Sequence, residues 1–149
     1  MTDVVNLTGD VARARARLVE FVDGCTAEQW ASSPLGDGVP RSVGVIVDHV
    51  ADAYEYLATW VGELARGDAV EVSSEIIDDL NARHAQGISA PTRPDAVDHL
   101  QRSGDAFIAL VESLSPVQLS GGDGRIVRFA QIAARHADSH VAELDAALR

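Results

Sequence analysis

The sequence predicts an all-α protein built as a four-helix bundle. Four long segments place apolar residues three and four positions apart, the spacing that keeps them on one face of a helix. No segment shows the strict alternation of apolar and polar residues that is typical of a half-buried strand. Four amphipathic helices of this length bury their apolar faces by packing against one another, so a bundle is expected.

The first two long helices are predicted over about residues 6–23 and 42–66. Ser42 is the expected N-cap of the second, and this helix is expected to end before Gly67. The residues between the two helices are rich in Gly, Ser and Pro and carry Trp30. The stripe of the first helix comprises Leu7, Val11, Ala14, Leu18, Phe21 and Cys25. The stripe of the second comprises Val43, Val47, Val50, Tyr54, Leu57, Val61 and Leu64.

A short extra helix is predicted in the second connection, ahead of the third long helix. Ser73 or Ser74 caps it, and it runs to Gly87. The third long helix opens after Thr92 and Pro94. Its apolar stripe comprises Val97, Leu100, Gly104, Phe107, Val111 and Leu114.

The fourth long helix is predicted over about residues 125–148, after the breaker GGDG. In the segment SPVQL before that breaker, Ser115 is an expected cap and Pro116 fits the first helical position. The fourth stripe comprises Ile126, Phe129, Ala133, His136, His140, Leu144 and Ala147. Two histidines therefore fall on a face that should be buried.

Length and composition restrict the classes of protein. The 149 residues suit one domain, spanning 1–149. A net charge of -11 repels nucleic acids and anionic membranes, so neither is an expected partner. No apolar run approaches the ~20 residues of a membrane helix and the N-terminus is unlike a signal peptide, so a cytoplasmic protein is expected. All twelve basic residues are arginine, which excludes Schiff-base chemistry and a Walker-type phosphate loop.

The histidines of the fourth helix form the strongest candidate site. His136 and His140 are four residues apart, so both rings point at one spot, where the neighbouring apolar residues offer no partners. An unpaired buried polar group costs about 1–3 kcal/mol, and a divalent metal would satisfy both rings. His49, at the edge of the second helix's apolar face, is the best third ligand, whereas His84 and His99 are weaker candidates. Ordinary core or surface histidines remain the alternative, because the spacing alone also arises by chance.

Three neutral histidines would leave coordination positions open, which is the layout of a catalytic site. Zinc, nickel, copper and iron all suit such ligands. Three hypotheses stay open: a metal-dependent thiol S-transferase acting on an electrophilic small molecule, a metal-dependent hydrolase, and a non-enzymatic metal-binding bundle. A hydrolase would need a base, for which Asp52, one turn after His49, is a weak candidate. Such a carboxylate is more often solvated or orients a ligand ring.

Several other residues are weaker candidates for a role at the site. Asn81 and Arg83 on the short helix could meet an anionic thiol or substrate, although a capping or surface pair is the simpler interpretation. Trp60 could wall a pocket or only fill the core. Asp138 is expected to be a surface charge, and the single Cys25 a small buried hydrophobe. Since apolar flanks of helical bundles often pair, a homodimer is one expectation.

Four segments carry a resemblance to a known family. They are SVGVIVDHVADAY, which contains His49, then IDDLNARHA, LSPVQL, and RFAQIAARHADSHVAEL, which contains His136 and His140. In their order and spacing the chain resembles the DinB-like superfamily of small four-helix-bundle metalloproteins, to which the mycothiol-dependent maleylpyruvate isomerases are related. The resemblance implies a bundle in up-down-down-up order and a metal-binding triad of His49, His136 and His140.

The same resemblance implies cofactors and partners. Members of the superfamily bind zinc, nickel or a similar divalent ion, and several are transferases or isomerases that use a small cellular thiol. Mycothiol is the thiol we expect if one is used, because the lysine-free composition suggests a GC-rich genome. The expected partners are therefore a small-molecule thiol and its substrate.

Overall fold

A computed structural model describes residues 3–35, 41–88 and 90–149, and its described part contains helices and no strand. This confirms the all-α prediction. Four long helices form the bundle: α1 (Val4–Gly24), α3 (Val43–Ala65), α5 (Arg93–Glu112) and α7 (Arg125–Leu148). The connections hold α2 (Ala27–Ala31), α4 (Ser74–Gly87), α6 (Pro116–Leu119) and a 3-10 turn, η1 (Gly122–Gly124).

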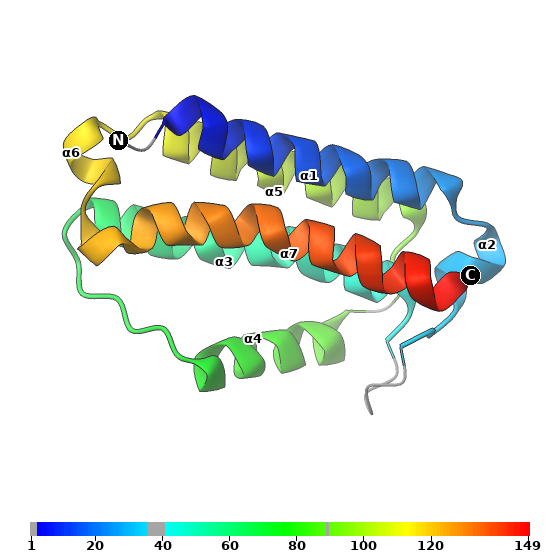
Figure 1. The fold of residues 1–149 in the computed structure, drawn as a ribbon. Coiled ribbons are helices and arrows are strands. Elements are labelled where there is room, and N and C mark those ends of the chain that lie inside the picture. Colours follow the sequence, from blue (N-terminus) through cyan, green and yellow to red (C-terminus); the bar gives the residue numbers. More distant parts are fainter. Residues whose placement is uncertain (1–2, 36–40, 89) are drawn as a thin grey trace.

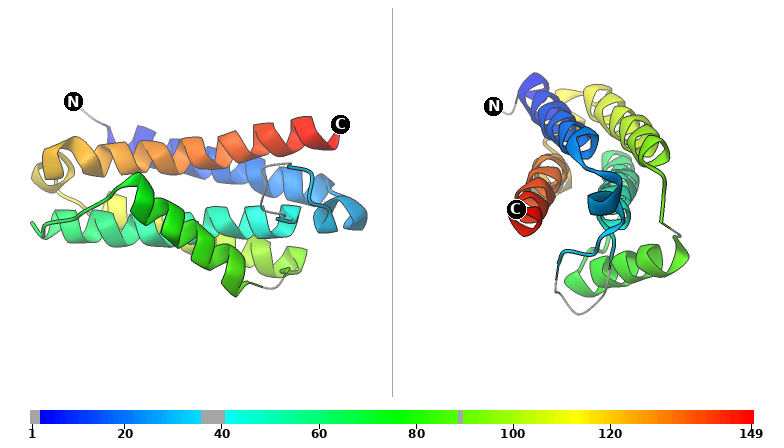
Figure 2. Two further views of the ribbon diagram at one scale, coloured as in Figure 1. Left: turned by 90° about the horizontal axis from the view of Figure 1, so that it is seen from below. Right: turned by 90° about the vertical axis from the view of Figure 1, so that its right-hand side faces the viewer.

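The long helices run in the expected up-down-down-up order. In Figure 1, α1 and α7 run in one direction, whereas α3 and α5 run in the other. Helices α1 and α3 each pack chiefly against α5 and α7, and therefore occupy opposite corners of the bundle. The antiparallel pair α3 and α7 faces the short helix α4, which lies outside the ring of four (Figure 2). The extra helix predicted in the second connection is therefore present.

Capping side chains set the helix boundaries that the sequence predicts. Ser42 accepts a hydrogen bond from the backbone N–H of Val45 at 3.1 Å, which starts α3. Ser73, rather than Ser74, caps α4. Ser115 caps α6, with Pro116 in its first turn. Each cap satisfies a backbone N–H that has no partner within the helix.

The apolar stripes form the core, with differences at their ends. All seven residues predicted for α3 are buried. On α1, Phe21 is only half-buried, and Val22 takes the core position. The prediction for Ala147 on α7 is wrong, because this residue is exposed. In the last turn of α7 it is Leu148, four residues after the buried Leu144, that packs against the core.

No helix in the described part of the chain is long and apolar enough to cross a membrane.

Candidate metal centre

Three histidines from two helices converge inside the bundle. Nε2 of His136 lies 3.1 Å from Nε2 of His49 and 3.0 Å from Nε2 of His140. The three side chains offer ligand atoms that all lie within 4.8 Å of one another, so together they could hold a metal ion. The structure therefore brings together the triad that the sequence predicts.

The helices explain this convergence. On α7 the spacing of four residues stacks His136 and His140 on one face. That face packs against α3, from which His49 enters the same space. His49 is 4% exposed, so it lies within the core rather than at the edge of the apolar face.

Burial keeps the triad neutral at physiological pH. It lowers the pKa of His49 to about 2, and the neighbouring His136 and His140 reinforce this shift. Burial, followed by the neighbouring His140, lowers the pKa of His136 to about 4. The pKa of His140 is also lowered, again chiefly by burial. Neutral imidazoles are the form that binds metal ions, because each retains a lone pair.

The spacing of the nitrogens suits a divalent ion. A Zn–N bond of about 2.0–2.1 Å and a tetrahedral angle place two ligand nitrogens about 3.3 Å apart. The two observed separations from His136 are within a few tenths of an ångström of that value. Nε2 of His136 carries either one proton or one lone pair, so it can form a normal hydrogen bond with only one of its two neighbours. A cation among the three rings would give each nitrogen a partner, and the three ligand atoms all lie within 4.8 Å of one another.

Sequence reasoning missed Glu143, which follows His140 by three residues on α7. Its Oε1 lies 3.1 Å from Nδ1 of His140. The two atoms are close but are not aligned for a hydrogen bond, and Nδ1 is buried without a hydrogen-bond partner in the described residues. A small rotation of Glu143 would complete the carboxylate–histidine contact that orients metal-binding histidines. The spacing H-x-x-E was the available signal.

A second polar cluster, which the sequence did not reveal, adjoins the triad on α3, with the ring centroids of His49 and His84 5.9 Å apart. Asp48 is buried and accepts hydrogen bonds from Nε2 of His84 at 2.8 Å and from Nδ1 of His99 at 2.7 Å. His99 also contacts Glu55 through its other nitrogen. His84, a weaker candidate for the third ligand, is held in this cluster, and its side chain is only 9% exposed. We call these four residues the Asp48 cluster.

In the Asp48 cluster, the contacts between carboxylates and histidines outweigh burial in setting the direction of the pKa shifts. Burial alone would raise the pKa of Asp48, but its bonds to His84 and His99 lower it overall. Burial alone would likewise lower the pKa of His99, yet Asp48 and Glu55 together raise it. The cluster fastens α4 and α5 to α3 through charge-assisted contacts.

Asp52, the candidate base, is half-buried on α3, and burial raises its pKa. Within the described residues, no hydrogen bond or ion pair reaches its carboxylate. The structure therefore gives it no link to the histidine triad.

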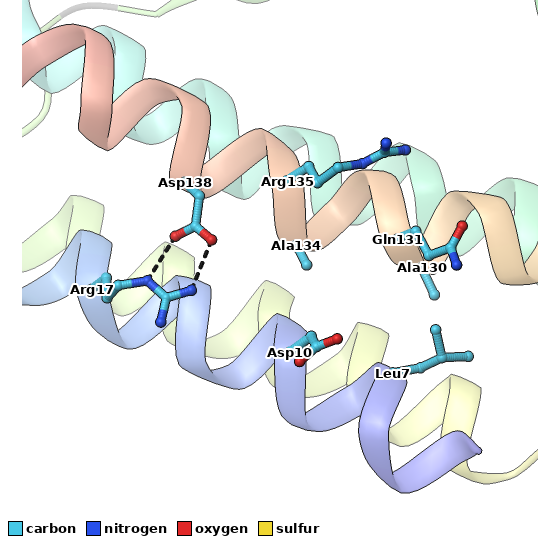
Figure 3. Close-up of a pocket in the computed structure, with 8 residues that line it drawn as sticks. All are labelled: Leu7, Asp10, Arg17, Ala130, Gln131, Ala134, Arg135 and Asp138. Atoms are coloured by element: carbon cyan, nitrogen blue, oxygen red, sulfur yellow. Dashed lines mark hydrogen bonds and ion pairs between the residues drawn. The ribbon is translucent and has the colours of Figure 1, made fainter. Parts of the chain in front are cut away.

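Two other predicted roles can be placed. Cys25 is buried, as expected, and burial raises the pKa of its thiol. Asp138 lies on the surface, where Arg17 of α1 donates two hydrogen bonds to it at 2.7 and 2.8 Å. This pair borders a groove of about 440 Å³ between α1 and α7 (Figure 3). None of the triad histidines lines that groove.

A smaller cavity, of about 170 Å³, adjoins the triad. His136 lines it, as do Trp60 and Asn81, two of the residues suggested as binding candidates. The third, Arg83, is not among its lining residues and forms an ion pair with Asp79 on the exposed side of α4. Both Trp60 and Asn81 therefore lie within reach of a molecule bound beside His136.

The family model of the DinB superfamily matches residues 10–144. The chain therefore belongs to this superfamily of helical, often metal-binding proteins. The match includes His49, His136 and His140, and it runs through all four long helices. No curated protein and no solved structure matches the chain.

Proposed function

We propose that the protein binds one divalent metal ion, zinc or nickel, through His49, His136 and His140. The observation that carries this proposal is the convergence of their nitrogens, with Nε2 of His136 at 3.0 and 3.1 Å from the other two. The lowered pKa values support it, because neutral rings can coordinate an ion without first losing a proton.

We further propose that the metal serves a thiol S-transferase, which uses mycothiol or a similar thiol to attack an electrophilic small molecule. When bound, the ion would lower the pKa of a coordinated thiol and so supply a thiolate at neutral pH. This route requires no protein base, which agrees with the lack of any hydrogen bond between Asp52 and the triad in the described residues. The partners would then be a small thiol and its substrate in the cytoplasm, with a homodimer as the proposed assembly.

Metal content tests the first step. Purified wild-type protein should contain about one zinc or nickel ion per chain, and His136→Ala should contain almost none. His99→Ala is the matched control, because it removes a half-buried histidine that does not belong to the triad. Equal, substoichiometric metal in wild type and in a folded His136→Ala variant would refute the site.

Thiol titration tests the second step. With cobalt or nickel in place, a coordinating thiol should produce a metal–sulfur charge-transfer band. No spectral change with any thiol, together with hydrolysis of ester or amide substrates, would favour the hydrolase. A negative result in both assays would favour a metal-binding protein without catalytic activity.

A further inference from the structure

Helix α4 lies beside the triad but stands outside the ring of the four long helices (Figure 2). The ring centroids of His84, on α4, and His49 are 5.9 Å apart. Ile77 and Asn81, earlier on α4, line the cavity of about 170 Å³ that His136 also lines. One helix therefore lies against two of the three histidines of the triad.

This helix is weakly packed. None of the residues of α4 is fully buried, whereas each of the four long helices fully buries at least six. Its inner face is half-buried, and the cavity separates part of that face from α3 and α7. Because side chains across a void have no partner atoms, that part of the face gains little from packing. A helix with so few buried contacts leaves the folded structure at a lower free-energy cost than one in the core.

One polar contact joins a side chain of α4 to the rest of the described structure. Nε2 of His84 donates a hydrogen bond to Oδ2 of the buried Asp48 at 2.8 Å. The ion pair between Arg83 and Asp79 lies within α4, on its exposed side. The bond from His84 to Asp48 is therefore the specific contact that fixes α4 against α3 in the described part of the chain.

The chain is fastened to the bundle again on either side of α4. Before this helix, Arg125 of α7 donates a hydrogen bond to the carbonyl of Val70 at 2.8 Å. After it, the indole N–H of Trp30 donates to the carbonyl of Pro91 at 2.9 Å. A helix held beyond both of its ends in this way can leave the bundle while the four long helices stay packed.

From these features we infer that α4 is a cover over the histidine triad, which opens as one unit and is held shut by the hydrogen bond between His84 and Asp48. The inference deepens the proposed function, on which it rests for the ion and the thiol whose entry the cover controls. A shut cover keeps water away from a bound thiolate, and an open one admits ligands.

Hydrogen exchange in the metal-free full-length chain, measured residue by residue by NMR, tests whether α4 opens by itself. The amides of residues 80–87 should share one protection factor, at least about 10-fold below those in the buried parts of α3 and α7, because an opening unit exposes them together. A helix that only frays would instead show a gradient of protection from its ends.

Variants of His84 test the hydrogen bond that holds the cover shut. His84→Ala removes the donor and should speed exchange in α4 by about 10-fold. His84→Gln should stay near the wild-type rate, because its amide N–H can still donate to Asp48. Arg83→Ala is the matched control, since it changes the neighbouring residue to alanine and breaks only an exposed ion pair. Circular dichroism checks that each variant is folded.

Chemical modification measures access to the triad without a metal. Diethyl pyrocarbonate reacts with neutral imidazoles, and tandem mass spectrometry resolves the adduct at each histidine. In His84→Ala, modification of His49 and His136 should be about 10-fold faster than in wild type, in proportion to the more frequent opening. In Arg83→Ala both modification rates should be unchanged.

Three results would overturn the inference. Amides of α4 that exchange as slowly as those of α3 would mean that α4 leaves only when the whole bundle unfolds. Equal exchange in wild type and in a folded His84→Ala variant would mean that the hydrogen bond does not hold the cover. Faster exchange with unchanged modification of His49 and His136 would show that α4 moves without controlling access.

Zinc titration of the same metal-free proteins separates this result from the proposed function. Zinc binding without separate opening of α4 overturns the cover alone. The expected exchange and modification rates without zinc binding support the cover and overturn the metal site.

Discussion

Two histidine clusters adjoin each other on α3, where they begin at adjacent residues, and the ring centroids of His49 and His84 lie 5.9 Å apart. His49 faces α7 and meets two further histidines. Asp48 faces α4 and α5 and meets His84 and His99. Histidine therefore has two different roles in this molecule, and the role depends on whether its nearest partner is another histidine or a carboxylate.

The partners decide the protonation of each cluster. In the triad, burial and neighbouring imidazoles lower the pKa values, so three lone pairs remain available. In the Asp48 cluster, Asp48 and Glu55 raise the pKa of His99 against the effect of its burial. Carboxylates occupy the ring nitrogens there, and the result is a structural contact. A buried histidine is thus available to a metal where at least one of its ring nitrogens keeps a lone pair that faces the other ligands.

The largest expected effect is on zinc affinity, which should depend on the triad and not on the Asp48 cluster. Removing His136 takes away one of three ligands, so His136→Ala should weaken zinc binding by about 100-fold or more, since even partners outside the ligand set cost about 10- to 100-fold. His99→Ala should change it little. Competition against a chromophoric chelator measures both constants. Equal losses in the two variants would show that the clusters are not functionally distinct.

The pH dependence of stability should have opposite signs in the two clusters. Without metal, the unfolded chain binds protons at the triad histidines near pH 6.5, whereas the folded chain, with lowered pKa values, does not. The triad therefore contributes stability above pH 6.5, and it is lost as the pH falls. Between about pH 7.5 and 5.5 the loss should be roughly 1 kcal/mol each for His49 and His136.

His99 has the opposite effect on the pH dependence of stability. Its raised pKa adds stability that is present below pH 6.5 and is lost as the pH rises through the folded value. Urea unfolding of the chelator-treated protein at several pH values should therefore give a steeper fall toward acid in His99→Ala than in wild type. His136→Ala should give a shallower one. Identical slopes in all three proteins would contradict the assigned environments.

Asp48→Ala should lower the free energy of unfolding by about 2 kcal/mol, because it leaves two imidazoles without their buried acceptor. The control is Asp98→Ala, which breaks an exposed pair with Arg102 and should cost less than about 0.5 kcal/mol. Urea unfolding at about pH 7.5 compares the two variants. A similar, small effect in both would mean that the Asp48 cluster adds no more than a surface ion pair.

Most of the fold could be predicted because residues that are buried on one helix face recur every three or four positions in the sequence. The stripe on α3 is correct at all seven positions, and Ser42 and Ser73 cap the helices expected to start there. The order of the bundle came instead from family resemblance, because apolar faces alone do not specify which helices run parallel. Ala147 shows the limit of the pattern, since the neighbouring Leu148 packs against the core at the end of α7 while Ala147 is exposed.

The two clusters differ in how far the sequence could predict them. His136 and His140 lie one turn apart on an otherwise apolar stripe, which indicated a shared site. Asp48 gave no such signal, because its partners come from α4 and α5, and only the packing of those helices brings them close. Whether a histidine meets an acid or another histidine depends on contacts between residues far apart in the sequence, such as Asp48 and His84, whose positions differ by 36.

The smaller of the two expected effects on zinc affinity concerns Glu143, the carboxylate that approaches the triad from α7. Glu143→Gln removes the charge opposite Nδ1 of His140, 3.1 Å away, and should weaken zinc binding by about 10-fold because the ring loses an orienting partner. The matched control is Asp145→Asn on the same helix, which breaks an exposed pair with Arg149 beyond the site. Competition against the same chelator measures both affinities, and an equal affinity in the two variants would contradict the orienting role. A loss of zinc affinity in Glu143→Gln alone would show that a carboxylate also assists the triad. That carboxylate would orient a ligand ring and leave its metal-binding lone pair free.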